Sequence, residues 1–157
     1  MILRRATADD AQSIAVVHRT AMRVSLAFLP ELHSAADDLR FFSERFLPAN
    51  EVWVAEVDDE VVGYVGFHEA WINHLYVLPE FQGRGIGPAL LDKALAYERP
   101  MQLWTFQQNT RARKFYEDRG FGLVKLTDGS GNEEKTPDAL YEWRPPRRNR
   151  AEIDQDL

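Results

Sequence analysis

The chain has 157 residues, of which 45% are hydrophobic and 28% charged, with a formal net charge of −6 and no cysteine. This composition excludes disordered proteins, disulfides, thiolate zinc sites and cysteine nucleophiles, and its acidity argues against nucleic acid as the main partner. Because the apolar runs are only a few residues long, we expect a cytoplasmic protein with no membrane span and no secretory leader, built as one domain.

The first fifty residues predict one short strand and two helices. Ile2 to Arg5 is the strand, and Thr7, followed by two acids, is a typical helix N-cap. Apolar residues recur at helical spacing as far as Met22, and Ser34 begins a second helix. The apolar stripe of that helix consists of Leu39, Phe42 and Phe46. The connection, residues 24–33, is too apolar for a solvated loop, so we expect it to cover part of the molecule.

From Glu51 onward the apolar pattern changes to period two. Strands are predicted over residues 52–57, 61–67, 72–78, 101–106, 121–126 and 139–143, with helices over 89–98 and from the N-cap Asn109 to Gly120. The order β-α-α-β-β-β-α-β-α-β-β predicts a mixed α/β (α+β) fold and not a doubly wound sheet. We expect one domain over residues 1–143 and a polar tail over 144–157.

Three alternating glycines stand between a predicted strand and a predicted helix, in the stretch Gln82-Gly83-Arg84-Gly85-Ile86-Gly87. Glycine permits a positive φ and a close backbone approach, and the N–H groups that begin the next helix favour an anion such as a pyrophosphate. Pro88 stands where a Rossmann loop needs its third glycine, and the Gly-Lys-Ser/Thr of a Walker loop is missing. The alternative is a glycine-rich turn that binds no ligand.

The stretch from Ile72 to Leu95 resembles the acetyl-CoA-binding motif of the GNAT superfamily of N-acetyltransferases: an apolar strand, then Gln/Arg-x-x-Gly-x-Gly/Ala, then a helix. A second block that is similar to the family consists of Asn109, Ala112, Phe115, Tyr116, Gly120 and Phe121. The resemblance extends over residues 2–143. It implies a GNAT fold, with a central mixed, mostly antiparallel sheet of about six to seven strands, flanked by about four helices and splayed at the cofactor site.

The resemblance also implies acetyl-CoA as the acetyl donor. The residues that would bind it are Leu75, Val77, Gln82, Gly83, Arg84, Gly85, Ile86, Gly87, Asn109 and Tyr116. Main-chain groups of the strand would bind pantetheine, and backbone N–H groups of the glycine loop would bind the pyrophosphate, with Arg84 adding charge. Arg84 could instead be a solvated arginine, and Asn109 a helix cap only. The four histidines show no metal-ligand spacing, so no metal is expected.

Tyr116 matches the family's general acid, whose hydroxyl protonates the departing thiolate; the alternative is a core aromatic. Many family members carry a glutamate or histidine base on the preceding strand. Counting back from Gln82 places Trp71 and Asn73 on the acceptor side, where neither is a base, and His74 on the opposite face. Glu69 in the turn before the strand is the remaining candidate for the base, against a solvated carboxylate.

The acceptor site is expected between two connections of the chain. In the family, the loop between the last two strands borders the substrate cleft; here it carries Glu133 and Glu134, which would attract a cationic amine unless they are solvated loop charges. Phe28 and His33 would form the opposite wall.

The expected function is direct acetyl transfer from acetyl-CoA to a primary amine, on a small molecule or a protein, in a ternary complex. The alternatives are a catalytically silent acyl-CoA-binding module that acts as a sensor or partner domain, and a nucleic-acid-binding tail with Arg144, Arg147, Arg148 and Arg150. We expect no nucleic-acid or membrane partner, and the sequence leaves a homodimer open.

Overall fold

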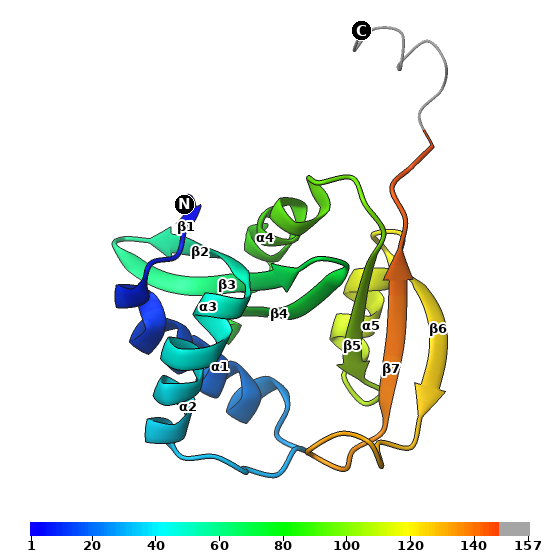
Figure 1. The fold of residues 1–157 in the computed structure, drawn as a ribbon, viewed down its shortest axis with the longest axis horizontal. Helices are drawn as coiled ribbons and strands as arrows, with labels where there is room; N and C mark the ends of the chain where they lie inside the picture. Colours follow the sequence, from blue (N-terminus) through cyan, green and yellow to red (C-terminus); the bar gives the residue numbers. More distant parts are fainter. Residues whose placement is uncertain (148–157) are drawn as a thin grey trace, which may run out of the picture.

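Seven strands form one mixed sheet in the order β1-β2-β3-β4-β5-β7-β6 (Figure 1). The computed structural model describes residues 1–147. The strands are β1 (Ile2–Arg5), β2 (Glu51–Val57), β3 (Glu60–His68), β4 (Trp71–Val77), β5 (Met101–Phe106), β6 (Gly122–Thr127) and β7 (Asp138–Trp143). Neighbouring strands are antiparallel except β4 and β5, which are parallel and share a single register pair, Trp71 with Gln102. The predicted mixed, mostly antiparallel sheet is therefore confirmed.

The helical segments are η1 (Ala8–Asp10), α1 (Ala11–Ser25), α2 (Ala35–Phe41), η2 (Phe42–Phe46, a π-helix), α3 (Leu47–Ala49), η3 (Pro79–Phe81), α4 (Ile86–Leu95) and α5 (Thr110–Glu117). Helix α4 begins three residues earlier than predicted, because Gly85 takes a left-handed φ of 84° as its N-cap. Among the described residues, no helix combines the length and the hydropathy that a membrane span requires.

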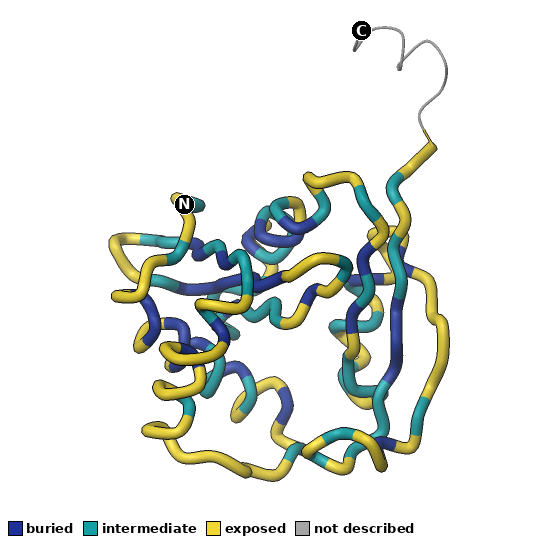
Figure 2. Tube along the Cα trace, viewed as in Figure 1, coloured by how far each residue is buried: buried dark blue, intermediate teal, exposed yellow. Residues whose placement is uncertain are grey.

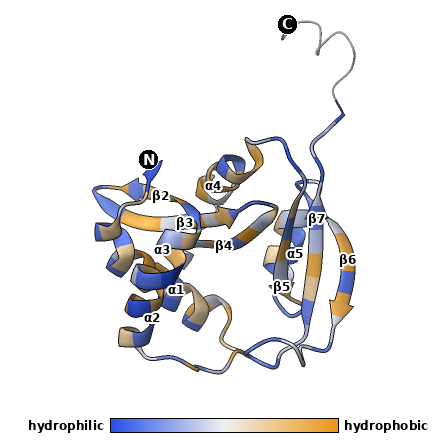
Figure 3. Ribbon diagram, viewed as in Figure 1, coloured by the Kyte–Doolittle hydropathy of each residue, from blue (hydrophilic) through white to orange (hydrophobic). Residues whose placement is uncertain are grey.

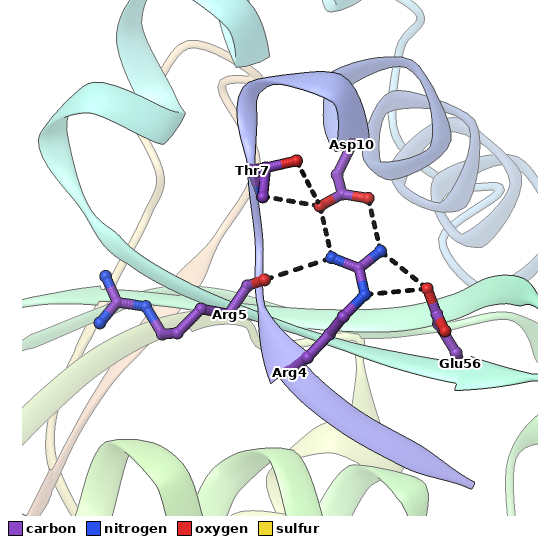
Figure 4. A network of polar contacts seen from close by, with 5 residues as sticks. All are labelled: Arg4, Arg5, Thr7, Asp10 and Glu56. Atoms are coloured by element: carbon purple, nitrogen blue, oxygen red, sulfur yellow. Dashed lines mark hydrogen bonds and ion pairs between the residues drawn. The ribbon is translucent and has the colours of Figure 1, made fainter.

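A charged network joins β1 to the start of the first helix (Figure 4). The Arg4 guanidinium donates two 2.8 Å hydrogen bonds to the Asp10 carboxylate and a 2.9 Å bond to Glu56. Asp10 also accepts a 2.7 Å hydrogen bond from the Thr7 N–H. Thr7 is therefore the N-cap, as predicted, and the Asp10 carboxylate reaches back to it as part of a capping box. Its hydrogen bonds with Arg4 lower the pKa of Asp10.

Two apolar clusters cover the two faces of the sheet. One packs β3, β4, β5 and β7 against α4 and α5, and the other packs β2, β3 and β4 against α1 and η2. Strand β3 is buried along most of its length (Figure 2), and hydrophobic segments alternate along it with less hydrophobic ones (Figure 3). Phe42 and Phe46 are buried as predicted, whereas Leu39 of the same predicted stripe is 39% exposed.

The chain leaves β7 as an extended segment. Arg144 forms a 3.0 Å ion pair with Glu142 of the strand. Arg148 and Arg150, and residues 148–157 of the predicted tail, lie outside the described residues.

Candidate active site

A cavity of about 640 Å³ lies beside the point where β4 and β5 separate. Its walls come from the end of β4, the glycine loop, α5 and the end of α1. Because the two strands pair only at Trp71 and Gln102, the backbone groups of the second half of β4 are free of a neighbour on that side. An extended ligand with amide groups fits such an edge, as an added strand does.

The glycine loop forms the floor of this cavity. Gly83 and Gly85 have φ values of 79° and 84°, and a Cβ atom on either would meet no other atom within 4 Å. The Gln82 side chain donates a 3.2 Å hydrogen bond to the Val77 carbonyl and so holds the loop against the end of β4. The first N–H groups of α4 start from this loop, and such groups favour an anionic ligand.

Eight of the ten predicted cofactor residues line this cavity: Leu75, Val77, Gln82, Gly83, Gly85, Gly87, Asn109 and Tyr116. The other two do not. The Arg84 guanidinium lies 5.0 Å from the centre of the Phe81 ring, and the Ile86 side chain is buried in the core. Asn109 accepts a 3.1 Å hydrogen bond from the Ala112 N–H, so it is the predicted cap of α5.

The sequence reasoning missed two cationic side chains of the cavity, Arg111 and Arg119. Arg119 lies with its guanidinium 3.9 Å from the centre of the Phe115 ring and donates a 2.9 Å hydrogen bond to the Phe115 carbonyl. The helical spacing of Ala112, Phe115 and Arg119 could have indicated that these residues share one face. Two arginines near the glycine loop add positive charge to the anion site.

Tyr116 stands at the inner end of the cavity. It extends from α5, is 8% exposed, and packs edge-to-face against Phe115 and Phe121 at centroid distances of 5.2 Å. Burial raises the pKa of the Tyr116 hydroxyl well above its usual range. The phenol is therefore protonated throughout the pH range in which proteins work, and it can act as a proton donor.

A second cavity, of about 530 Å³, lies on the α1 side of β4. Its walls include His18 and Met22 of α1 and His74 and Tyr76 of β4. The two cavities share Leu26 and Tyr76, so they meet at these two side chains. Burial, reinforced by the negative charge of Glu134, raises the pKa of Tyr76 to about 12.

Two histidines form an aromatic stack in the second cavity. The rings of His18 and His74 are 5.2 Å apart and nearly parallel, at 9°. His74 Nδ1 is 2.9 Å from the Tyr64 hydroxyl, whereas His18 Nδ1 is buried and has no partner among the residues that the structure describes. Burial lowers the pKa of His18 to about 4 and that of His74 to about 3, so both rings are neutral at pH 7.

The prediction of which β4 side chains face the acceptor is wrong for His74, and β4 also contains a bulge. Gly66 of β3 pairs with His74 and Phe67 pairs with Ile72, so Asn73 is an extra residue and the alternation of faces is interrupted. His74 lies on the regular side of the bulge and lines the second cavity together with Tyr76, two residues further on. Trp71 and Asn73 line neither cavity. Asn73 instead donates a 2.8 Å hydrogen bond to Asn50.

Glu69, the predicted base, also lies away from both cavities. It occupies the tight β3–β4 turn with a φ of 51°, its side chain is 80% exposed, and its nearest ionic partner is His68 at 3.6 Å. Within residues 1–147, no group of three potential metal ligands is present.

The predicted acceptor walls do come together. His33 Nε2 is 2.5 Å from the Glu133 carboxylate, and both side chains line the second cavity together with Glu134. Phe28 does not line the cavity itself; it packs edge-to-face against Phe106, which does, with centroids 6.2 Å apart. Residues about 100 positions apart in sequence, 33 and 133, thus form one rim.

Comparison with known proteins identifies similar chains. Residues 19–121 match the model of the "Acetyltransferase (GNAT) family". An uncharacterized N-acetyltransferase of Archaeoglobus fulgidus is 32% identical over 151 residues, which are 85% of this chain and all of the relative. The peptidyl-lysine N-acetyltransferase YjaB of Salmonella typhimurium is 29% identical over 123 residues, covering 78% of this chain and 83% of the relative.

Solved structures are similar in fold. Apo YjaB from Escherichia coli superimposes with a TM-score of 0.75 at 20% identity, covering 93% of this chain and all of the other. The PaiA N-acetyltransferase from Thermoplasma acidophilum, in complex with coenzyme A, gives a TM-score of 0.71 at 20% identity, over 91% of this chain and 98% of the other.

Proposed function

This chain belongs to the GNAT family of acetyltransferases, and on that premise we propose that it transfers the acetyl group of acetyl-CoA directly to a primary amine in a ternary complex. The observation that carries the proposal is the junction of two cavities at Leu26 and Tyr76, one lined by the glycine loop and the other by acids and aromatic rings. We assign the activity to residues 1–143, as a single catalytic domain.

The first cavity fits a thioester of coenzyme A. The open space above Gly83 and Gly85, the start of α4, and Arg111 and Arg119 suit phosphates, while the unpaired edge of β4 suits the amides of pantetheine. Acetyl-CoA supplies an activated acetyl group there.

The protein then orients the reaction and supplies one proton. The neutral amine attacks the thioester carbonyl carbon, so that a C–N bond forms and the C–S bond breaks, while a backbone N–H of residues 75–77 donates to the developing oxyanion. Tyr116 donates its proton to the departing sulfur. The proton that the amine loses passes to water, and water reprotonates Tyr116. Because the chain contains no cysteine, the acetyl group does not pass through a thioester on the protein.

The second cavity suits a cationic acceptor. Its two histidines are neutral at pH 7, so they do not repel an ammonium group. The negative charge of Glu134 acts on Tyr76, whose pKa it helps to raise, and it would likewise attract an ammonium group. Histidines with such low pKa values are also weak bases, so the amine loses its proton to water.

The test is a screen of primary amines that follows CoA release and identifies the acetylated product by mass spectrometry. Acetyl-CoA binding, measured by calorimetry, is recorded in parallel. Release of CoA with a matching acetylated amine supports the proposal. Tight acetyl-CoA binding without turnover on any amine would favour the silent acyl-CoA-binding module, for which the lack of a strong base on β4 is the supporting observation.

A further inference from the structure

The segment that joins α1 to α2, residues 26–33, crosses the outer side of the second cavity, and we refer to it as the strap. Two arginines of α1 bind the half of the strap that leads to α2: Arg23 pairs with Glu31 at 2.5 Å, and Arg19 donates a 3.1 Å hydrogen bond to the His33 carbonyl. The strap then contacts the far half of the molecule through two side chains. His33 contacts Glu133 of the β6–β7 loop, and Phe28 contacts Phe106 at the end of β5. The strap and the β6–β7 loop therefore lie against one another (Figure 1).

The loop on the far side is well placed to hold the strap, because its own hydrogen bonds make it rigid. The Asn132 side chain bonds both the N–H and the carbonyl of Thr136, at 3.2 and 2.7 Å. Lys135 donates a 2.8 Å bond to the Ser130 carbonyl, and Gln107 ties the loop to β5 through the carbonyls of Thr127 and Asp138. Glu133 is thus presented from an ordered loop.

The strap restricts what can reach the reaction centre. Among the described residues, the two cavities share Leu26 and Tyr76, so an acceptor in the second cavity must place its nitrogen there. The strap residues Leu29, Pro30 and Leu32 line the outer wall of that cavity. A volume of about 530 Å³ suits a small molecule. A lysine on a protein surface brings its own backbone and neighbours, and the His33–Glu133 and Phe28–Phe106 contacts at the rim stand in the way of these groups.

We infer that the second cavity takes a free, small primary amine with an apolar body, and that the Phe28 and His33 contacts of the strap exclude lysines displayed on proteins. The chemistry of the lining supports this class: five carboxylates and only two guanidinium groups surround it, both guanidinium groups are paired, and the inner wall is aromatic. The inference rests on the proposed function, because it names the acceptor class of the same site.

The experiment compares three acceptors by their kcat/KM: 2-phenylethylamine, a short peptide with one lysine, and folded cytochrome c. The strap variant is the double substitution Phe28→Ala/His33→Ala. Its matched control is Tyr97→Ala/His68→Ala, which removes one aromatic and one histidine that line neither cavity. Far-ultraviolet circular dichroism and acetyl-CoA affinity verify that each variant is folded.

The wild-type protein and the control should prefer 2-phenylethylamine to the peptide by at least about tenfold, which corresponds to about 1.4 kcal/mol. Folded cytochrome c should be the poorest acceptor. The strap variant should raise the ratio of peptide to small-amine kcat/KM by about tenfold. A folded strap variant with an unchanged ratio, or wild-type acetylation of cytochrome c as efficient as that of the small amine, would overturn the inference while leaving acetyl transfer intact. If no amine releases CoA, the proposed function fails and the inference falls with it.

Discussion

The Tyr116 phenol lines the first cavity and is almost fully buried. The Tyr116 ring packs against Phe115 and Phe121, and burial raises the pKa of its hydroxyl, so the phenol is protonated and can donate to a departing thiolate. The same burial makes the ring part of the core between α5 and the sheet. Removal of the hydroxyl alone therefore separates the chemical role from the packing role.

Tyr116→Phe should lower kcat by on the order of 10²–10⁴, because it removes a proton donor and leaves the ring in place. Acetyl-CoA affinity and the free energy of unfolding should change little. The control is Tyr97→Phe, which deletes only a hydroxyl that donates to Glu51 outside both cavities. Steady-state kinetics and calorimetry measure both effects. If Tyr116→Phe turned over at the wild-type rate, Tyr116 would be a core aromatic only.

The pH dependence of the rate should be set by the pKa of the acceptor amine and not by the pKa of a group on the protein. His18 and His74 have pKa values of about 4 and 3, and that of Tyr76 is about 12, so none of these groups changes its charge between pH 6 and 10. As pH rises, kcat/KM should increase with the neutral fraction of the amine. Two small amines with different pKa values should show correspondingly displaced profiles. A break at one common pH for both amines would contradict this and indicate a base on the protein.

At the scale of single elements, the glycine loop and α4 form the most specialised segment. Gly85 has a left-handed backbone, and the space beside its Cα belongs to the cavity. A side chain at this position would therefore be strained and would also occupy the space of the ligand. Gly120 has a similar φ of 88° but lies beside Trp143, away from the cavity. Substitutions at Gly85 and Gly120 therefore distinguish the effect of backbone strain from the effect of a side chain that blocks the ligand.

Gly85→Val and Gly120→Val should each lower the free energy of unfolding by on the order of 1–3 kcal/mol, because a valine is strained at positive φ. Only Gly85→Val should weaken acetyl-CoA binding, since its side chain extends into the cavity. Chemical denaturation and calorimetry give the two quantities. Equal acetyl-CoA affinities for the two variants would contradict the assignment of this loop to the cofactor.

The elements themselves could be predicted well from sequence, but the direction in which the β4 side chains point could not. The periodicity indicated all seven strands within one or two residues, and the motif indicated Asn109 and Tyr116. The bulge at Asn73 depends on a tertiary contact: a side chain on Gly66 would collide with the Phe46 ring, which lies over β3 at this point. His74 was assigned to the wrong face for a different reason: it alternates regularly with Tyr76, but alternation alone does not tell which face of the sheet lies toward α1 and the second cavity.

At the scale of the whole molecule, the histidine stack adds sensitivity to acid. The pKa values of His18 and His74 in the folded protein, about 4 and 3, are lower than their ordinary value of 6.5. Their contribution to stability is complete above pH 6.5 and is lost as pH falls from there toward 4, because the unfolded chain then binds more protons. Loss of the hydrogen-bonded Asp10 charge adds to this only below the ordinary carboxyl value of 3.8.

Between pH 6.5 and 4 the free energy of unfolding should therefore fall by up to about 1.4 kcal/mol per pH unit for each histidine. His18→Gln should remove one of the two contributions and give a shallower slope, whereas Gln12→Ala on the same helix should leave the slope as it is. Urea denaturation at several pH values measures this. Parallel slopes for His18→Gln and the wild-type protein would show that His18 is not neutral in the fold.

The single register pair between β4 and β5 has a consequence for the connectivity of the molecule. Strands β1–β4 come from one continuous piece of chain, and β5–β7 come from the next, so the polypeptide passes from one half-sheet to the other once, through the exposed segment after α4 that contains Glu98. A cut at that segment would divide the protein into two fragments without severing either half-sheet. Because a ligand in the first cavity contacts both fragments, acetyl-CoA should promote their reassembly, which would make the fold a natural candidate for a split reporter of acetyl-CoA.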